Sequence, residues 1–321
     1  MNTIGKLYKE ESESIKKQIW ENGLFVFDTN FLLNFFRSSK NVRSQLFSIL
    51  ELLEKQIWIP DQVAHEFYRN KENVRVQREE AYTQITPKVD EFVSFCTNTL
   101  RYSDSEKNKL KKSIESYLEK AEKEFDITKE TAEEIVSRLE LLFKNKIGES
   151  FDDKKREDLI KNARKRYAIN IPPGFCDKSK NADPNSQYGD FFFWEQIILK
   201  ANKEKKDVVL VTNDMKADWW HNCGKNIELF RVELKNEFIT RTKKNILPYT
   251  QRSFLKDFSK FKDKSIKLNF SNENSDANQR INALQLLAIM DRVMPQNLRQ
   301  LLKHTEQINR LSGLNWVPWN K

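Results

Sequence analysis

The sequence predicts an α/β fold built around a mainly parallel central sheet. Two short runs of consecutive apolar residues, 23–27 and 208–211, are typical of strands that are buried on both faces. Segments with helical spacing of apolar residues lie between them, and such alternation of strands and helices favours a parallel sheet. Each run ends in a polar tripeptide, Asp28-Thr29-Asn30 after the first and Thr212-Asn213-Asp214 after the second.

The other elements follow in chain order. A polar helix ends near Trp20, and further helices are expected over 31–36, 41–55 and 190–205. Strands are also expected at 56–60 and 227–232. The first of these two strands is followed by a helix that starts near Asp61 and carries Glu66. Ligands of open parallel sheets bind beyond the carboxyl ends of the strands, so Asp28 and Asp214 are predicted to lie at a binding crevice.

The domain organisation is predicted from changes in composition. The α/β domain is expected to be discontinuous, over 1–70 and 166–270. Residues 71–165 are highly charged, with apolar residues spaced three and four apart, which indicates an inserted helical hairpin or small bundle. Residues 271–321 are expected to form a C-terminal helical tail, split at Pro295. The tail could dock on the domain, on a second copy of the chain or on a neutralising partner protein.

The positive charge of the chain lies at its C-terminal end. The formal net charge is +9, and residues 235–321 contain 16 basic and 7 acidic side chains, whereas the preceding segments are neutral. This distribution suits a polyanion such as a nucleic acid better than a small neutral substrate. A lysine-rich surface that only faces solvent is the alternative.

Other features limit the location and the chemistry of the protein. No signal peptide is recognisable, and no apolar run approaches the roughly 20 residues that span a bilayer, so a cytoplasmic protein without membrane contact is expected. Cys96, Cys176 and Cys223 are far apart and form no CxxC pair. Neither a disulfide framework nor a zinc knuckle is therefore indicated.

Four carboxylates could meet at the crevice. Asp28 and Asp214 follow two core strands, Glu66 lies about one turn into a helix, and Asp190 begins another helix. Taken singly, each is typical of a helix cap or a strand end. Together they would repel one another unless a cation neutralised them, and ligands that are all oxygen favour Mg²⁺ or Mn²⁺ over zinc.

Two other enzyme classes fit the sequence poorly. A dinucleotide-binding oxidoreductase needs a glycine-rich turn after its first strand, and the turn at Asp28 contains no glycine. A phosphatase with an aspartyl nucleophile would need a second aspartate two residues further on, where Asn30 stands.

Five strings of the sequence carry a family resemblance: FVFDTNFLLNFF, IPDQVAHEF, IPPGFCDKSK, YGDFFFWEQIILKA and VVLVTNDMKADWW, in this order. They resemble the PIN-like domain family, in particular larger bacterial members with a helical insertion. The resemblance covers roughly 23–70 and 168–258 and implies a PIN-like three-layer α/β fold. It leaves the insertion and the tail without a match.

The resemblance also implies an activity and a site. The activity would be that of an endoribonuclease dependent on one or two Mg²⁺ or Mn²⁺ ions, serving as a toxin or in phage defence. Its catalytic and metal-binding residues would be Asp28, Glu66, Asp190 and Asp214. Supporting residues or alternate ligands would be Asn30, Asp177, Asn213 and Asp218, with Asp218 as a substitute for Asp214.

Basic and aromatic side chains are candidates for nucleic-acid contact. Phosphates could be bound by Lys178, Lys180, Lys216, Lys260, Lys262 and Lys264, and unpaired bases could stack on Phe175, Trp219 and Trp220. For the tryptophans, core packing is the alternative. Two other functions stay open: a DNA-directed flap-type or single-strand nuclease, and an inactive scaffold that binds RNA or protein.

Overall fold

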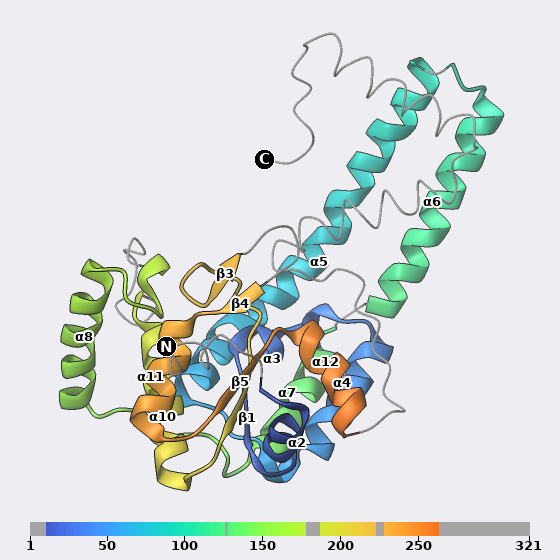
Figure 1. Cartoon of the computed structure of the whole chain (residues 1–321). Coiled ribbons are helices and arrows are strands. Elements are labelled where there is room, and N and C mark those ends of the chain that lie inside the picture. Colours follow the sequence, from blue (N-terminus) through green and yellow to red (C-terminus); the bar gives the residue numbers. More distant parts are fainter. Residues whose placement is uncertain (1–10, 100, 126–127, 178–186, 223–227, 263–321) are drawn as a thin grey trace. The chain divides into compact units, whose positions relative to one another are not determined.

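Three parallel strands form the central sheet, in the order β1-β2-β5 (Figure 1). In the computed structural model, which describes residues 11–99, 101–125, 128–177, 187–222 and 228–262, these strands span Leu24–Phe27, Val208–Val211 and Ile246–Tyr249. All residues of β1 and β2 are buried, as expected for apolar strands covered on both faces. Phe27 pairs with Val211, and Val211 with Tyr249, so the three carboxyl ends lie together.

Helices cover both faces of this sheet (Figure 1). One side carries α2 (Glu13–Asn22), α3 (Thr29–Arg37), α4 (Lys40–Leu52) and α12 (Gln251–Phe261), and the other carries α10 (Gly189–Glu204) and α11 (Val232–Thr242). On the first side, Trp20 stacks on Phe254 with ring centroids 5.4 Å apart. On the second, the rings of Trp194 and Phe238 lie 5.9 Å apart. This arrangement agrees with the predicted α/β class.

Two further helices belong to the same compact unit. The apolar face of α7 (Lys129–Phe143) enters the main core through Ile135 and Leu139. Helix α8 (Asp153–Ala168) packs on aromatic side chains at the start of α10 and forms a smaller core with them. The unit therefore includes residues 128–165, which the sequence assigned to the insertion over 71–165.

The second compact unit begins at Glu79 within α5 (Asp61–Asn98) and continues through α6 (Asp104–Phe125). Its core joins Val89, Val93 and Cys96 of α5 to Leu110 and Ile114 of α6. These positions recur at helical spacing, which gives each helix one apolar stripe. The predicted tail over 271–321 lies outside the described residues.

The sheet differs from its prediction in three places. The strand predicted over 56–60 is not formed. Residues in this range make only single parallel bridges, Phe25 to Ile57 and Ile59 to Ile147, and α5 begins directly after them at Asp61. The strand expected over 227–232 is β4 (Glu228–Phe230), which pairs antiparallel with β3 (Trp220–Asn222) outside the parallel sheet. The third strand of the parallel sheet is β5, which the sequence did not predict.

Strand β5 contains Pro248, which cannot donate to a ladder and is tolerated at a sheet edge. This proline makes the strand hard to recognise in the sequence. None of the helices in the described part of the chain is both long and apolar enough to cross a membrane.

Candidate active site

Asp28 is fixed at the carboxyl end of β1, where it also caps α3. Its Oδ1 accepts a hydrogen bond from the backbone N–H of Phe31 at 2.8 Å. Its Oδ2 accepts from Thr212 Oγ1 at 2.7 Å and from the Asn213 N–H at 2.9 Å. Burial raises the pKa of Asp28 to about 6, although these three hydrogen bonds favour the charged form.

Glu66 is oriented from both sides of its carboxylate. Thr29 Oγ1 donates to Glu66 Oε2 at 2.8 Å, and Gln62 Nε2, one helical turn earlier, donates to Oε1 at 2.7 Å. The carboxylate lies against the start of α10, because a Cβ added to Gly189 would be 2.7 Å from Glu66 Oε1. Only glycine leaves room for this approach.

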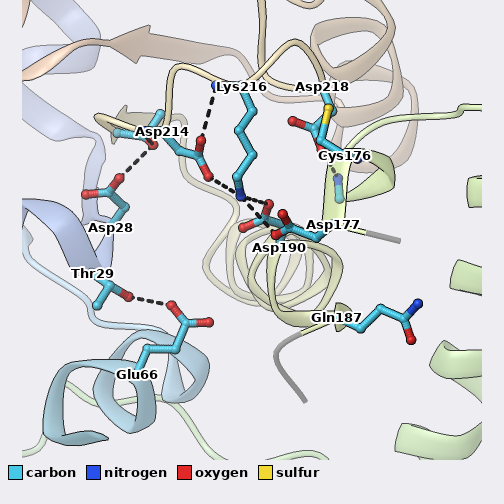
Figure 2. Close-up of polar contacts among 12 residues, drawn as sticks. Asp28, Thr29, Glu66, Cys176, Asp177, Gln187, Asp190, Asp214, Lys216 and Asp218 are labelled. Carbon is cyan, nitrogen blue, oxygen red and sulfur yellow. Dashed lines mark hydrogen bonds and ion pairs between the residues drawn. The ribbon is translucent and has the colours of Figure 1, made fainter. Parts of the chain in front are cut away.

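Three aspartates surround the ammonium of Lys216 (Figure 2). Lys216 Nζ lies 2.9 Å from Asp177 Oδ2, 3.1 Å from Asp190 Oδ2 and 2.7 Å from Asp214 Oδ2. Asp177 ends a short 3-10 turn, Asp190 lies in the first turn of α10, and Asp214 follows β2. The fold thus brings three distant segments to one cation.

The cluster has more negative charge than Lys216 neutralises. Burial raises the pKa of Asp190 to about 7, with contributions from the carboxylates of Asp214 and Asp177 that offset the attraction of Lys216. Burial acts to lower the pKa of Lys216, but the surrounding carboxylates, Asp190 foremost, raise it above its usual value. A site with these properties favours either an added proton or an added cation.

Asp218 holds the loop that carries Asp177. It is fully buried, and its Oδ2 accepts from the backbone N–H groups of Gly174 at 2.9 Å and Cys176 at 3.1 Å. The Asp177 N–H in turn donates to the Gly174 carbonyl at 3.0 Å. Asp218 therefore positions the loop that delivers Asp177 to Lys216, which the sequence did not predict.

Asn213 and Asn30 differ in their roles. Asn213 Nδ2 donates to Gln251 Oε1 at 2.8 Å, and the Gln251 N–H donates back to Asn213 Oδ1 at 2.9 Å. This pair ties the loop after β2 to the start of α12, and Asn34 also donates to Gln251. Asn30 is half-buried in the first turn of α3, and no hydrogen bond joins its side chain to the described carboxylates.

The tryptophans expected to stack on bases belong to the core. Trp219 and Trp220 are 1% and 4% exposed, and the Trp219 ring contacts Phe193 with centroids 5.9 Å apart. Of the two alternatives, core packing therefore holds for both tryptophans. Phe175 is half-buried, with the guanidinium of Arg231 5.9 Å from its ring centroid.

Three of the expected phosphate-binding lysines lie in the described part of the chain, and they are not gathered in one place. Lys216 lies in the acidic cluster, whereas Lys260 pairs with Glu13, and Lys262 Nζ donates to Gln56 Oε1 at 2.7 Å. Gln56 in turn contacts the Gly23 carbonyl, just before β1, so Lys262 lies at the opposite end of β1 from Asp28. Lys178, Lys180 and Lys264 lie outside the described residues.

Several partners of the carboxylates were missed by the sequence reasoning. Thr29 and Thr212 belong to the two polar tripeptides, so their hydroxyls could have been suspected from that repetition. Gln62 lies four residues before Glu66, the spacing at which helical side chains meet. Gly189 and Gln251 carry no such signal, because their contacts depend on how distant helices pack.

The oxygen-rich cluster suits a hard divalent cation in charge and in chemistry. Asp28, Glu66, Asp190 and Asp214 could supply carboxylate oxygens, and Asp177 lies with the last two around Lys216. Among the described residues, no three acidic, histidine or cysteine side chains are already arranged as ligands of one ion. Lys216 holds the central position.

The comparisons with known proteins give a family match but no individual relative. No curated protein and no solved structure matches the chain. A family model described as a PIN like domain matches residues 24–234, a range that includes every carboxylate of the cluster. PIN-like domains have a nuclease-type fold, are generally hydrolases and typically use divalent metals. Since the match covers more than half of the 321 residues, the chain belongs to the PIN-like domain family.

Proposed function

We propose that the protein is an endonuclease that hydrolyses phosphodiester bonds of RNA with the help of Mg²⁺ or Mn²⁺. The observation that supports the proposal is a chain of carboxylates. Burial, helped by the charge of Asp214, raises the pKa of Asp28 to about 6, and Asp214 shares the ammonium of Lys216 with Asp190, whose pKa is raised to about 7. Membership of the PIN-like domain family supports the same chemistry.

One or two ions would be held by Asp28, Glu66, Asp190 and Asp214, with Asp177 as an additional ligand. A bound divalent ion of this kind activates a water for attack on the phosphorus and stabilises the leaving oxygen. Carboxylates around such an ion must be deprotonated, so the ion would replace the protons that burial now favours on Asp28 and Asp190.

The protein's own contribution is orientation and charge. Thr212 and the Asn213 N–H hold one oxygen of Asp28, and Thr29 and Gln62 fix the Glu66 carboxylate. Because these donors are already in place, the carboxylates pay little conformational entropy when they bind a ligand. Lys216 is a candidate to contact a phosphate, since its side chain is 31% exposed beside the carboxylates.

The test is cleavage of labelled single-stranded RNA, structured RNA and single-stranded DNA in Mg²⁺, Mn²⁺ or EDTA. We expect metal-dependent cutting of RNA that falls at least about a hundredfold in Asp28→Asn and Asp190→Asn. Glu204→Gln is the matched control, because Glu204 ends α10 and pairs only with Lys200 and Lys206 among the described residues. Full activity in EDTA, or in both aspartate variants, would refute the metal-dependent nuclease.

Two other functions predict different outcomes when the same substrates are tested for cleavage and for binding. Cutting of DNA without RNA would favour the DNA-directed nuclease. The ion pairs of Lys216 favour a second candidate, an RNA-binding or protein-binding scaffold, because a lysine already neutralises part of the acidic cluster. A scaffold would bind RNA equally well in Mn²⁺ and EDTA and would cut none of the substrates.

A cellular role as a toxin or phage-defence effector is part of the proposal and rests on the family resemblance alone. Induced expression of the wild-type chain should then arrest growth, and the Asp190→Asn variant should not. Equal growth with both proteins would remove the toxin role and leave the nuclease proposal standing.

A further inference from the structure

We infer that Lys216 is a resident cation of the acidic cluster, which a divalent ion has to displace in order to bind among Asp177, Asp190 and Asp214. The inference rests on the proposed function, because it concerns the same metal site. Lys216 then competes with the metal ion for the carboxylates, so the affinity for the metal depends on this lysine as well as on the carboxylates.

The contacts of the ammonium are complete. A lysine ammonium has three N–H donors, and Lys216 Nζ has three carboxylate oxygens within 2.7 to 3.1 Å, one from each aspartate. The three aspartates come from separate segments, so the ammonium joins parts of the fold that are otherwise distant in sequence. The exposed fractions of their side chains are 7%, 20% and 18%. Screening by water is therefore limited.

A divalent ion and the ammonium cannot share these oxygens. Mg²⁺ binds carboxylate oxygens at about 2.0 to 2.1 Å, so an ion on the same three oxygens would lie only a few ångströms from Nζ. Two cations at such a distance repel strongly in a partly buried site. Metal binding through these three Oδ2 atoms therefore requires that the ammonium leaves.

The side chain of Lys216 is able to leave. It has four flexible carbons, and 31% of it is exposed, so a path to solvent is open. Its backbone N–H donates to Asp214 Oδ1 at 3.2 Å, which keeps the residue at the edge of the cluster after its ammonium has moved. The displaced ammonium would stay beside the metal site.

The experiment is calorimetric titration of Mn²⁺ into the full chain, for the wild type and for Lys216→Met. We expect the variant to bind Mn²⁺ at least about tenfold more tightly, because no ammonium competes. It should also have a lower Tm in EDTA and gain more in Tm on addition of Mn²⁺. Lys200→Met is the matched control, since Lys200 pairs with Glu204 at 2.6 Å, away from the cluster.

The outcomes separate the inference from the proposed function. Equal or weaker Mn²⁺ binding by Lys216→Met, with tight binding by the wild type, would overturn the inference alone. No Mn²⁺ binding by either protein would overturn the metal-dependent function and the inference with it. If Lys216→Met folds only in Mn²⁺, the inference is supported, and Lys216→Gln, whose amide can still donate to the carboxylates, should then fold in EDTA and bind Mn²⁺ more tightly than the wild type.

Discussion

The buried carboxylate of Asp218 accepts a hydrogen bond from the backbone N–H of Gly174, at 2.9 Å. Gly174 has a φ of +94°, and a Cβ at this position would lie 2.0 Å from the Tyr167 hydroxyl. The loop therefore depends on a glycine conformation and on a carboxylate acceptor. Three residues after Gly174, the same loop presents Asp177 to Lys216.

Replacing Asp218 with leucine should loosen this loop. The N–H groups of Gly174 and Cys176 would lose their acceptor, which costs about 1 to 3 kcal/mol of stability for buried groups. Because Asp177 would no longer be held, we expect Mn²⁺ affinity to fall several-fold more than in Asp218→Asn, which keeps one acceptor oxygen. Calorimetry at a temperature where both variants are folded measures this. Equal affinities would mean that Asp218 has no positioning role.

A methyl group at Gly189 should damage the site while sparing the fold. In Gly189→Ala the new Cβ would approach Glu66 Oε1 to 2.7 Å and push the carboxylate away from its place. The backbone of Gly189 is helical and alanine favours helices, so the free energy of unfolding should change by less than about 1 kcal/mol. We expect cleavage to fall at least about tenfold, measured beside urea unfolding in EDTA. Wild-type activity would show that the position of Glu66 does not matter.

The metal-free protein should become less stable as the pH rises through 7. Burial raises the pKa of Asp190 from 3.8 to about 7, so the folded state binds this proton more tightly than the unfolded state. The resulting stabilisation is complete below about pH 4 and is lost as the pH rises through 7. Compared with Asp190→Asn, the wild type should lose on the order of 3 kcal/mol between pH 4 and 8.

Urea unfolding in EDTA, at several pH values between 4 and 8, gives this difference directly. The comparison with Asp190→Asn isolates the contribution of Asp190 together with that of the charged groups coupled to it, because the asparagine does not titrate. A wild-type protein that gains stability over the variant in this range would contradict the raised pKa of Asp190.

Charge reversal of Lys260 and Lys262 should affect folding more than RNA binding. The two lysines contact Glu13 and Gln56, at the opposite end of β1 from Asp28. We expect the double glutamate variant to be slightly less stable than the wild type and to keep its RNA affinity and salt slope. Fluorescence anisotropy at several salt concentrations measures both. Weaker binding with a flatter slope would assign these lysines to the RNA-binding surface.

Local pattern was sufficient to predict part of the site. The apolar runs before Asp28 and Asp214 require burial on both faces, so they predict two core strands, and β1 pairs with β2 in parallel as expected. Glu66 was placed on the helix that follows a proline, and the structure begins α5 at Asp61. The sequence also predicted that the polar ends of the two strands would meet, as Thr212 and Asp28 do at 2.7 Å.

By itself, then, the sequence determined the α/β class, the family and the acidic residues at the strand ends, because hydrophobic periodicity and short motifs are local properties of the chain. Tertiary structure alone decided that Lys216 sits among three aspartates, that Asp218 holds the loop of Asp177, and that Trp219 is core. Apart from the pair of Lys216 with Asp214, these relationships join residues tens of positions apart. They depend on how α8, α10, the loop over 174–177 and the residues after β2 pack, and no local pattern encodes that packing.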